Sequence, residues 1–195
     1  MRRKFLILFG LAVVLAAQPL FAAKFKVDHA HTNIGFSVKH MVVAKTTGSF
    51  NDFTASLELD PADMSSFTVM ATIQAASIDT NNENRDNHLR SADFLDAANH
   101  PTITFVSSEL STMDGKHVLH GDLTIRGVTH AVEIPIEIVG PVMAMGNTVV
   151  GFAGSLTINR HDYGVSWSRT LDNGGLVVAE EVAIEVNGEF IMESM

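Results

Sequence analysis

The sequence predicts an all-β domain of eight or nine antiparallel strands, interrupted by one short helical excursion. Three observations support this fold class. Apolar side chains alternate with polar ones along most of the chain, glycine-containing turn signals separate many of these runs, and one polar segment lacks the alternation. A period of two residues places one face of a strand in a core and the other in solvent. Such strands must stack as two sheets or close into a barrel to remove their edges.

Residues 1–22 read as a secretory signal that precedes the fold. Three basic residues at positions 2–4 come before an apolar stretch at 5–17, and Pro19 then breaks the helix. This layout is typical of a signal peptide, and the apolar stretch is short for a membrane span. We favour cleavage after Ala22, with a cut after Ala23 and an uncleaved anchor as the alternatives. The domain would then occupy 23–195, in the periplasm, without a stable membrane anchor.

Charge and cysteine content exclude several classes of protein. The 195-residue chain has a formal charge of −9 and contains no cysteine. Removing residues 1–22 takes away three basic residues and no acidic one, which makes the charge −12. An acidic chain does not fit a nucleic-acid partner, because phosphate binding needs clustered Lys and Arg. The lack of cysteine excludes disulfides, thiolate metal sites and a lipid-modified N-terminal cysteine.

The clearest strand lies at 128–139, where Val132, Ile134 and Ile136 alternate with polar residues and Pro135. Proline cannot donate a hydrogen bond to a neighbouring strand, so Pro135 indicates an edge, a bulge or a weakly paired position. The same alternation recurs at 34–38, 53–59, 67–73, 103–105, 119–125, 150–158 and 182–190.

Turn signals separate several of these runs. They are Asp114-Gly115, Arg126-Gly127, Gly140-Pro141, Gly146-Asn147 and Asn173-Gly174-Gly175. The inward-facing sets mix large and small residues, as in Phe53 with Ala55 and Phe152 with Gly154. This mixing favours a barrel over two stacked sheets, since it can fill a taper or leave a cavity. There is no internal repeat or linker, so a single domain is the simplest interpretation.

The polar segment is predicted to be helical. Thr80 and Glu83 match a capping box at the start of a helix over 81–90. Ser91 is a candidate cap for a second short turn over 92–98. The helical excursion would therefore connect two strands.

Arg85, His88 and Arg90 come close together in this excursion, within an otherwise acidic chain. One interpretation is a solvated helix held by local ion pairs with neighbouring carboxylates. The other is a small cationic mouth that binds an anionic head group. The residues alone favour the ion pairs, which are common and individually weak at protein surfaces.

Nine histidines raise the question of a metal site. His29 and His31 would share one face of a strand and could form a ligand pair, whereas His117 and His120 would point to opposite faces. There is no H-E-x-x-H motif, so we favour scattered histidines and expect no metal. The motifs G-x-S-x-G and S-x-x-K and a phosphate-binding loop are also absent from the sequence. We therefore expect no catalytic residue and no cofactor.

The run N-x-x-R-D-x-H-L-R-S-x-D-F at 82–94 resembles the signature of the YceI-like family of secreted lipid-binding proteins. Supporting matches extend along nearly the whole chain, at 27–40, 48–53, 121–129 and 164–167. The resemblance implies an extended, lipocalin-like antiparallel β-barrel of eight strands, with a helical segment near one end. It also implies a hydrophobic tunnel for a long-chain amphiphile, such as a polyisoprenoid or a fatty-acid derivative.

The resemblance makes a hydrophobic small molecule the expected partner, carried for transport, storage or stress protection. Some relatives in the family accompany membrane cytochromes or stress responses. Two alternatives stay open: a lipid-modifying enzyme, and an assembly partner in transient contact with a membrane respiratory protein. A homodimer also stays open.

Two groups of residues are candidates for ligand contact. Those expected to contact the ligand tail are Phe36, Val38, Phe53, Phe94, Phe105, Phe152 and Trp167. Ordinary core packing must also account for most of them. Those expected near an entrance are His40, Arg85, His88 and Arg90. His40 shares a strand face with Phe36 and Val38, so it is either a buried polar contact or a core histidine.

Secretion can be tested on the protein exported by cells. N-terminal sequencing is expected to begin at Ala23, because the basic and apolar segments would be removed with the signal. A product that retains Met1 would contradict this prediction.

Overall fold

The computed structural model describes residues 22–41, 43–60, 63–170, 172 and 174–193. The predicted signal peptide lies outside the described residues, apart from its last residue, Ala22. Among the described residues, no helix combines the length and the hydrophobicity needed to cross a membrane.

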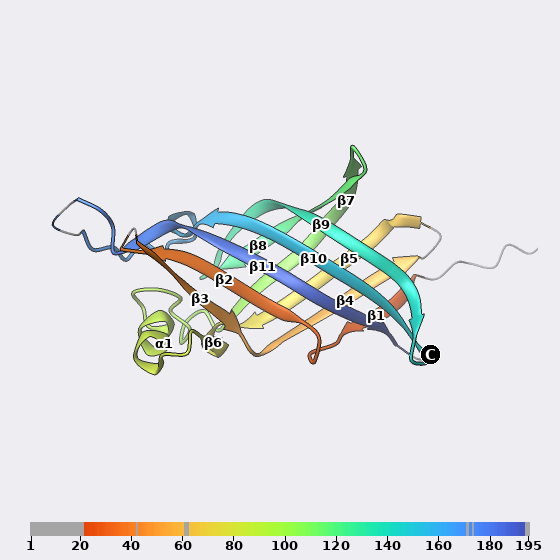
Figure 1. Cartoon of the computed structure of the whole chain (residues 1–195), viewed down its shortest axis with the longest axis horizontal. Coiled ribbons are helices and arrows are strands. Elements are labelled where there is room, and N and C mark those ends of the chain that lie inside the picture. Colours follow the sequence, from red (N-terminus) through yellow and green to blue (C-terminus); the bar gives the residue numbers. More distant parts are fainter. Residues whose placement is uncertain (1–21, 42, 61–62, 171, 173, 194–195) are drawn as a thin grey trace, which may run out of the picture.

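Eight antiparallel strands close into a barrel (Figure 1), which confirms the predicted fold class. In order around the ring they are β1 (Ala23–Val27), β4 (Phe53–Asp60), β5 (Asp63–Gln74), β7 (Thr102–Met113), β8 (Lys116–Ile125), β9 (Val128–Ala144), β10 (Asn147–Asn159) and β11 (Val178–Met192). Pairing of β1 with β11 closes the ring, with Phe25 opposite Met192 and Val27 opposite Phe190.

Three further strands extend the sheet from β11. They are β2 (Asn33–His40), β3 (Ala44–Phe50) and β6 (Ile78–Asp79). The N-terminal part of β11 pairs with β2, and its last residues pair with β1. The described chain thus has more strands than the eight or nine predicted, because β3 is largely polar and β6 has only two residues.

The helical excursion contains α1 (Glu83–Arg90) and follows the 3₁₀ turn η1 (Ala75–Ser77). The predicted capping box is wrong. Asn82 caps α1, since its side-chain oxygen accepts a hydrogen bond from the Arg85 backbone N–H at 3.1 Å. The Thr80 hydroxyl donates instead to the Asp86 carboxylate and accepts a hydrogen bond from Arg85 Nε, and it does not cap the helix.

Ser91 ends α1 and also caps the turns that follow it, as predicted, since its hydroxyl oxygen accepts a hydrogen bond from the Asp93 backbone N–H at 3.4 Å. Its backbone N–H and its hydroxyl both donate to the His88 carbonyl oxygen. Residues 92–98 form a series of turns, in which the Phe94 N–H also bonds to the Ser91 carbonyl. A second 3₁₀ turn, η2 (Arg160–Tyr163), follows β10.

Most of the predicted turns connect adjacent strands. Asp114-Gly115 and Arg126-Gly127 form the β7–β8 and β8–β9 turns, and Gly146 lies in the β9–β10 turn. The Gly140-Pro141 prediction is wrong, because this cis peptide lies inside β9. The pairing register shifts opposite it, so it is an irregularity in a continuous strand. Asn173 of the last predicted turn lies outside the described residues.

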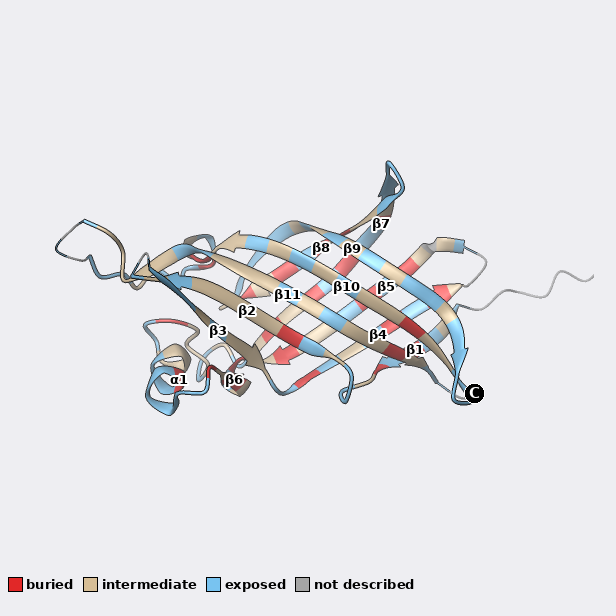
Figure 2. Ribbon diagram, viewed as in Figure 1, coloured by how far each residue is buried: buried red, intermediate tan, exposed pale blue. Residues whose placement is uncertain are grey.

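The densest core fills one end of the barrel, near β1 (Figure 2). The largest fully buried side chains are Phe25, Leu57, Leu59, Phe67, Val150 and Phe190. They come from β1, β4, β5, β10 and β11, and the strand register places Phe25 opposite Leu57. Inward-facing residues of β9 and β10, such as Ile136 and Leu156, are only half-buried. The barrel is therefore filled at one end and less densely packed along β9 and β10.

Leu57 tests the role of this filled end. Its side chain has 0% exposure, so Leu57→Ala should lower the free energy of unfolding by about 2–5 kcal/mol through lost burial and a new cavity. Val139→Ala is the matched control at a 64% exposed site, where the change should be roughly 0.5 kcal/mol or less. Urea denaturation followed by circular dichroism measures both. Equal losses would contradict this placement of the core.

Candidate functional site

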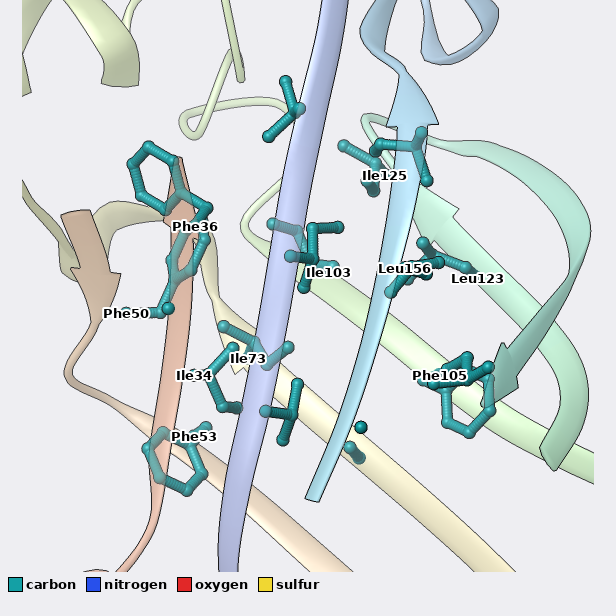
Figure 3. Close-up of a pocket in the computed structure, with 18 of the residues that line it drawn as sticks. Ile34, Phe36, Phe50, Phe53, Ile73, Ile103, Phe105, Leu123, Ile125 and Leu156 are labelled. Atoms are coloured by element: carbon teal, nitrogen blue, oxygen red, sulfur yellow. The ribbon is translucent and has the colours of Figure 1, made fainter. Parts of the chain in front are cut away.

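An internal cavity of about 250 Å³ runs through the barrel and is the candidate site (Figure 3). Side chains from opposite walls converge on it, among them Phe36 of β2, Phe53 of β4 and Phe105 of β7. The two-residue period explains this, since every second side chain of each strand points into the barrel. Of the described wall residues, only Thr32, Arg160 and Tyr163 carry polar side-chain groups. We call this cavity the tunnel.

Six of the seven predicted tail contacts line the tunnel. They are Phe36, Val38, Phe53, Phe94, Phe105 and Phe152. Trp167 is the exception, since it is not among the lining residues and packs against neighbouring rings instead. Its ring centroid lies 5.3 Å from that of Phe94 and 5.3 Å from that of His88. Trp167 therefore contacts a wall residue and does not itself line the tunnel.

The excursion after β6 contributes apolar side chains to the tunnel, and we call residues 80–100 the cover. Leu89, Phe94 and Leu95 of the cover line the cavity. Its polar residues hold it against the barrel. Arg90 donates through Nε to the Ala76 carbonyl oxygen at 2.7 Å and through Nη2 to the Ile78 carbonyl oxygen at 2.7 Å.

A second set of hydrogen bonds joins α1 to Thr80. Asp86 is buried and accepts from the Thr80 backbone N–H at 3.0 Å and from its hydroxyl. Arg85 donates through Nε to Thr80 Oγ1 and through Nη2 to the Thr80 carbonyl oxygen, both at 2.7 Å. The polar residues of the 82–94 run thus have a clear structural role in fixing the cover.

The four predicted entrance residues do not line the tunnel. Arg85 and Arg90 direct guanidinium donors to Thr80 and to backbone carbonyls, as described above. His88 is hydrogen-bonded to Asp93, with Nε2 and Oδ2 2.9 Å apart, so one of the expected local pairs is present. His40 ends β2, half-buried, opposite Val178 of β11. Contact of these four residues with a ligand stays a prediction.

Sequence reasoning did not identify the role of Arg126. From the β8–β9 turn, its guanidinium donates to the carbonyl oxygens of Phe94 at 2.8 Å, Ala92 at 2.9 Å and Gly164 at 3.0 Å. It thereby joins the cover to the segment after η2. These acceptors lie more than thirty residues away and are backbone atoms, so no local pattern identifies them.

Arg160 is the one cationic residue among the described tunnel walls, yet its charged group is bound elsewhere. It is 5% exposed and donates to the carbonyl oxygens of Val165, Val178 and Ala179. Burial lowers its pKa, with Glu180 acting in the opposite direction, and burial raises the pKa of the neighbouring Tyr163. Because the Arg160 guanidinium already donates to backbone carbonyls, the tunnel provides little positive charge for binding an anionic group.

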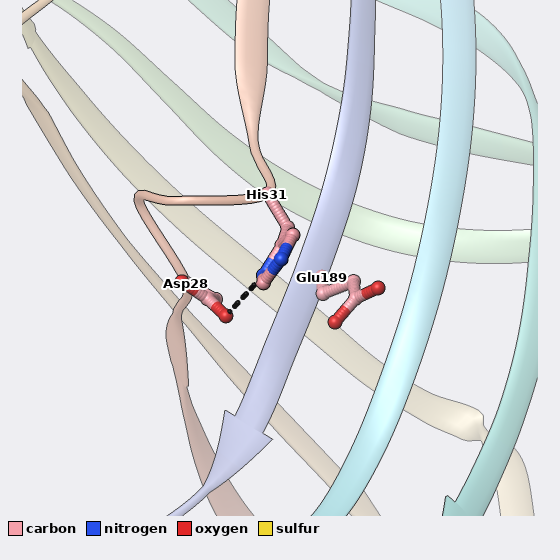
Figure 4. A group of neighbouring side chains, drawn as sticks. All are labelled: Asp28, His31 and Glu189. Carbon is pink, nitrogen blue, oxygen red and sulfur yellow. Dashed lines mark hydrogen bonds and ion pairs between the residues drawn. The ribbon is translucent and has the colours of Figure 1, made fainter. Parts of the chain in front are cut away.

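A polar group of three residues lies away from the tunnel, at the β1–β2 connection (Figure 4). One ligand-type atom from each of Asp28, His31 and Glu189 lies within 4.8 Å of the others. His31 Nδ1 and Asp28 Oδ2 are 2.8 Å apart. The expectation that His29 and His31 share a strand face is wrong, since both lie in this connection and His29 packs on Phe53 at 4.9 Å.

The His31–Asp28 pair should titrate as a unit. The hydrogen bond and charge of Asp28 raise the pKa of His31 above 6.5, and the hydrogen bonds from His31 and the Ala30 N–H lower the pKa of Asp28. The Asp28 contribution to stability is lost as pH falls through its lowered pKa. The His31 contribution is full below about pH 6.5 and is lost as pH rises through its raised pKa.

In an NMR titration, Asp28→Asn should lower the pKa of His31, whereas Glu180→Gln should leave it unchanged. An unaltered value in Asp28→Asn would contradict the pairing.

Comparison with known proteins agrees with this architecture. A UPF0312 protein of Staphylococcus epidermidis is 38% identical over 173 residues, which is 88% of this chain and 99% of that relative. The crystal structure of Burkholderia cenocepacia BcnA superposes with a TM-score of 0.73 at 28% identity, over 86% of this chain and 99% of that one.

A polyisoprenoid binding domain from Saccharophagus degradans shares the fold at 14% identity, with a TM-score of 0.63 over 88% of this chain and 99% of that domain. The YceI-like domain family matches residues 25–190, which include nearly all of the barrel. The chain therefore belongs to the YceI-like domain family.

Proposed function

We propose that this protein is a periplasmic carrier that holds the chain of a long amphiphile, such as a polyisoprenoid or a fatty-acid derivative, in its tunnel. Binding would serve transport, storage or stress protection and would involve no catalysis. The observation that carries the proposal is the apolar wall, to which every barrel strand and the cover contribute. Export is supported by the signal-like pattern at the N-terminus.

The chemistry of the wall supports a hydrocarbon ligand. Aromatic and branched aliphatic side chains make up most of the wall, and the guanidinium of Arg160 is bound to backbone carbonyls. Each methylene buried in such a site contributes about 0.8 kcal/mol, so a long chain binds usefully without a polar anchor. The Saccharophagus degradans domain of the same fold carries the description polyisoprenoid binding, which is in line with this ligand class.

The wall also supports binding over catalysis. The chain has no cysteine, and the polar groups of the cover are directed to the protein itself. Formation of a modified lipid by the purified protein would overturn this part of the proposal and favour the enzyme alternative. Co-purification with a membrane complex without bound lipid would favour the assembly partner instead.

Phe105 provides the sharpest test of the tunnel. Its side chain is 9% exposed and points inward, whereas Val106, the next residue of β7, is 47% exposed and points outward. Phe105→Arg places a charge in the apolar tunnel and should abolish lipid uptake, while Val106→Arg should preserve it. Native mass spectrometry after purification from cells, and after incubation with geranylgeraniol, measures bound lipid.

Ala71→Phe is a second variant that adds no charge. Ala71 lies opposite Phe105 in the ladder and lines the tunnel, so a larger apolar side chain there should reduce the room for a ligand. It keeps the test valid if Phe105→Arg does not fold, because burying an unpaired charge is costly. Wild-type uptake in both folded variants, or no lipid in the wild-type protein, would overturn the proposal.

A further inference from the structure

The barrel wall has a split between β9 and β10. Residues 136–144 of β9 pair with β10, but residues 128–136 pair with β8 on the other side. From Ser155 to Asn159, β10 keeps its partner β11 and has no paired β9 residue among those described. The two strands therefore separate beyond the pair formed by Ile136 and Gly154.

Pro135 explains where the split begins. The backbone groups of successive strand residues face opposite neighbours. Pro135 has no N–H, yet it pairs with Val118 without a register shift. Pro135 therefore occupies a non-hydrogen-bonded position opposite β8. The hydrogen bonds to β8 are made by its neighbours, Ile134 and Ile136. The backbone nitrogen of Pro135 then faces β10, where it cannot donate to the next residue, Ser155. The ladder between β9 and β10 ends at this point.

An open groove lies along the split. A slot of about 580 Å³ is lined by residues of β9, β10 and β11, including Val132, Leu156 and Ile158. Leu156, Ile158 and Ile184 line both the slot and the tunnel, so the two cavities share a wall.

Both ends of the slot are bounded. At one end the Ile136–Gly154 pair joins the strands. At the other, His130 of β9 contacts η2: its Nε2 lies 3.0 Å from the Asp162 carbonyl oxygen, and its ring packs edge-on against Tyr163 at 5.0 Å. The slot is therefore a defined gap in the wall, with the strands held together on either side.

The outer rim of the slot is polar and acidic. Glu133, Ser155, Thr157 and Glu185 are exposed around it, and none of the described lining residues is Lys or Arg. His120 Nδ1 lies 3.7 Å from Glu133 Oε1. An anionic head group would be repelled here, whereas a hydroxyl could donate to the carboxylates.

We propose that this slot is a lateral portal, through which the hydrocarbon chain of an amphiphile enters the tunnel and at which an uncharged head group stays. The inference rests on the proposed function and adds the route and the head-group class. It also addresses size, because the tunnel alone lies just below the roughly 300–1,000 Å³ typical of small-molecule sites. A long chain with its polar end at the rim would use both cavities.

Cross-linking tests the route. The chain has no cysteine, so Glu133→Cys with Thr157→Cys can be joined across the slot by a short bismaleimide. The matched control is Glu137→Cys with Ala153→Cys, two residues directly opposite each other in the intact part of the same strand pair. Transfer of tritiated geranylgeraniol from phosphatidylcholine vesicles should slow about tenfold or more when the slot is cross-linked, because such a bridge blocks opening. The control cross-link should leave the rate unchanged.

A second variant acts through the backbone. Pro135→Val restores an N–H that can extend the ladder to Ser155, so uptake should again be slower than in the wild-type protein. Unchanged rates in both the cross-linked slot and Pro135→Val would overturn the portal. If geranylgeraniol still binds in that case, the proposed function stands, whereas no binding by the untreated wild-type protein would contradict the proposed function itself.

The head group is tested with two lipids that share one chain. Geranylgeraniol should bind more tightly than geranylgeranyl phosphate. The double variant Glu133→Gln with Glu185→Gln removes both rim carboxylates. It should strengthen binding of geranylgeranyl phosphate by roughly fivefold, because like charges at close range repel even in water. The affinity for geranylgeraniol should stay nearly unchanged. Tighter binding of the phosphate by the wild-type protein would overturn the assignment of an uncharged head group.

Discussion

Closure of the sheet through β11 is the constraint on which the rest of the structure depends. This strand pairs with β10 along most of its length, with β2 at its beginning and with β1 at its end. Once the ring is closed, every second side chain of each strand must point inward. Large apolar side chains fill the end near β1, while the walls farther along enclose a cavity. The tunnel is thus a consequence of closure combined with the sizes of the inward residues.

The cover and the split regulate how this cavity meets its surroundings. Arg90 attaches the cover to the preceding backbone carbonyls, and Arg126 attaches it to the β8–β9 turn, which positions Phe94 against the tunnel, while Arg85 binds Thr80 within the cover. Hydrogen bonds of charged donors are among the stronger ones in proteins, so the cover is firmly attached at this end. The wall between β9 and β10 lacks such bonds where Pro135 ends the ladder. The side wall therefore has a stretch without β9–β10 pairing, whereas the cover is held by hydrogen bonds of charged donors.

Local patterns predicted most of the fold. The alternation at 128–139 and the turns at Asp114-Gly115 and Arg126-Gly127 reflect backbone preferences that act over a few residues, and β9 and both hairpins follow them. Where short-range rules compete, prediction failed. Thr80 is a good helix cap in isolation, but Asp86 binds its hydroxyl and Asn82 caps α1. Gly140-Pro141 suits a turn, yet pairing with β10 on both sides keeps it within a strand.

The sequence by itself determined the strands, the polar excursion, the apolar character of the inward faces and the family resemblance, because each depends on residues close together in the chain. Only the tertiary structure decided that Phe36, Phe94 and Phe105 share one tunnel and that Trp167 packs behind Phe94. It also decided that the guanidinium groups bind within the protein and that Pro135 faces β10. These features depend on register and closure between distant segments, which a two-residue period does not encode.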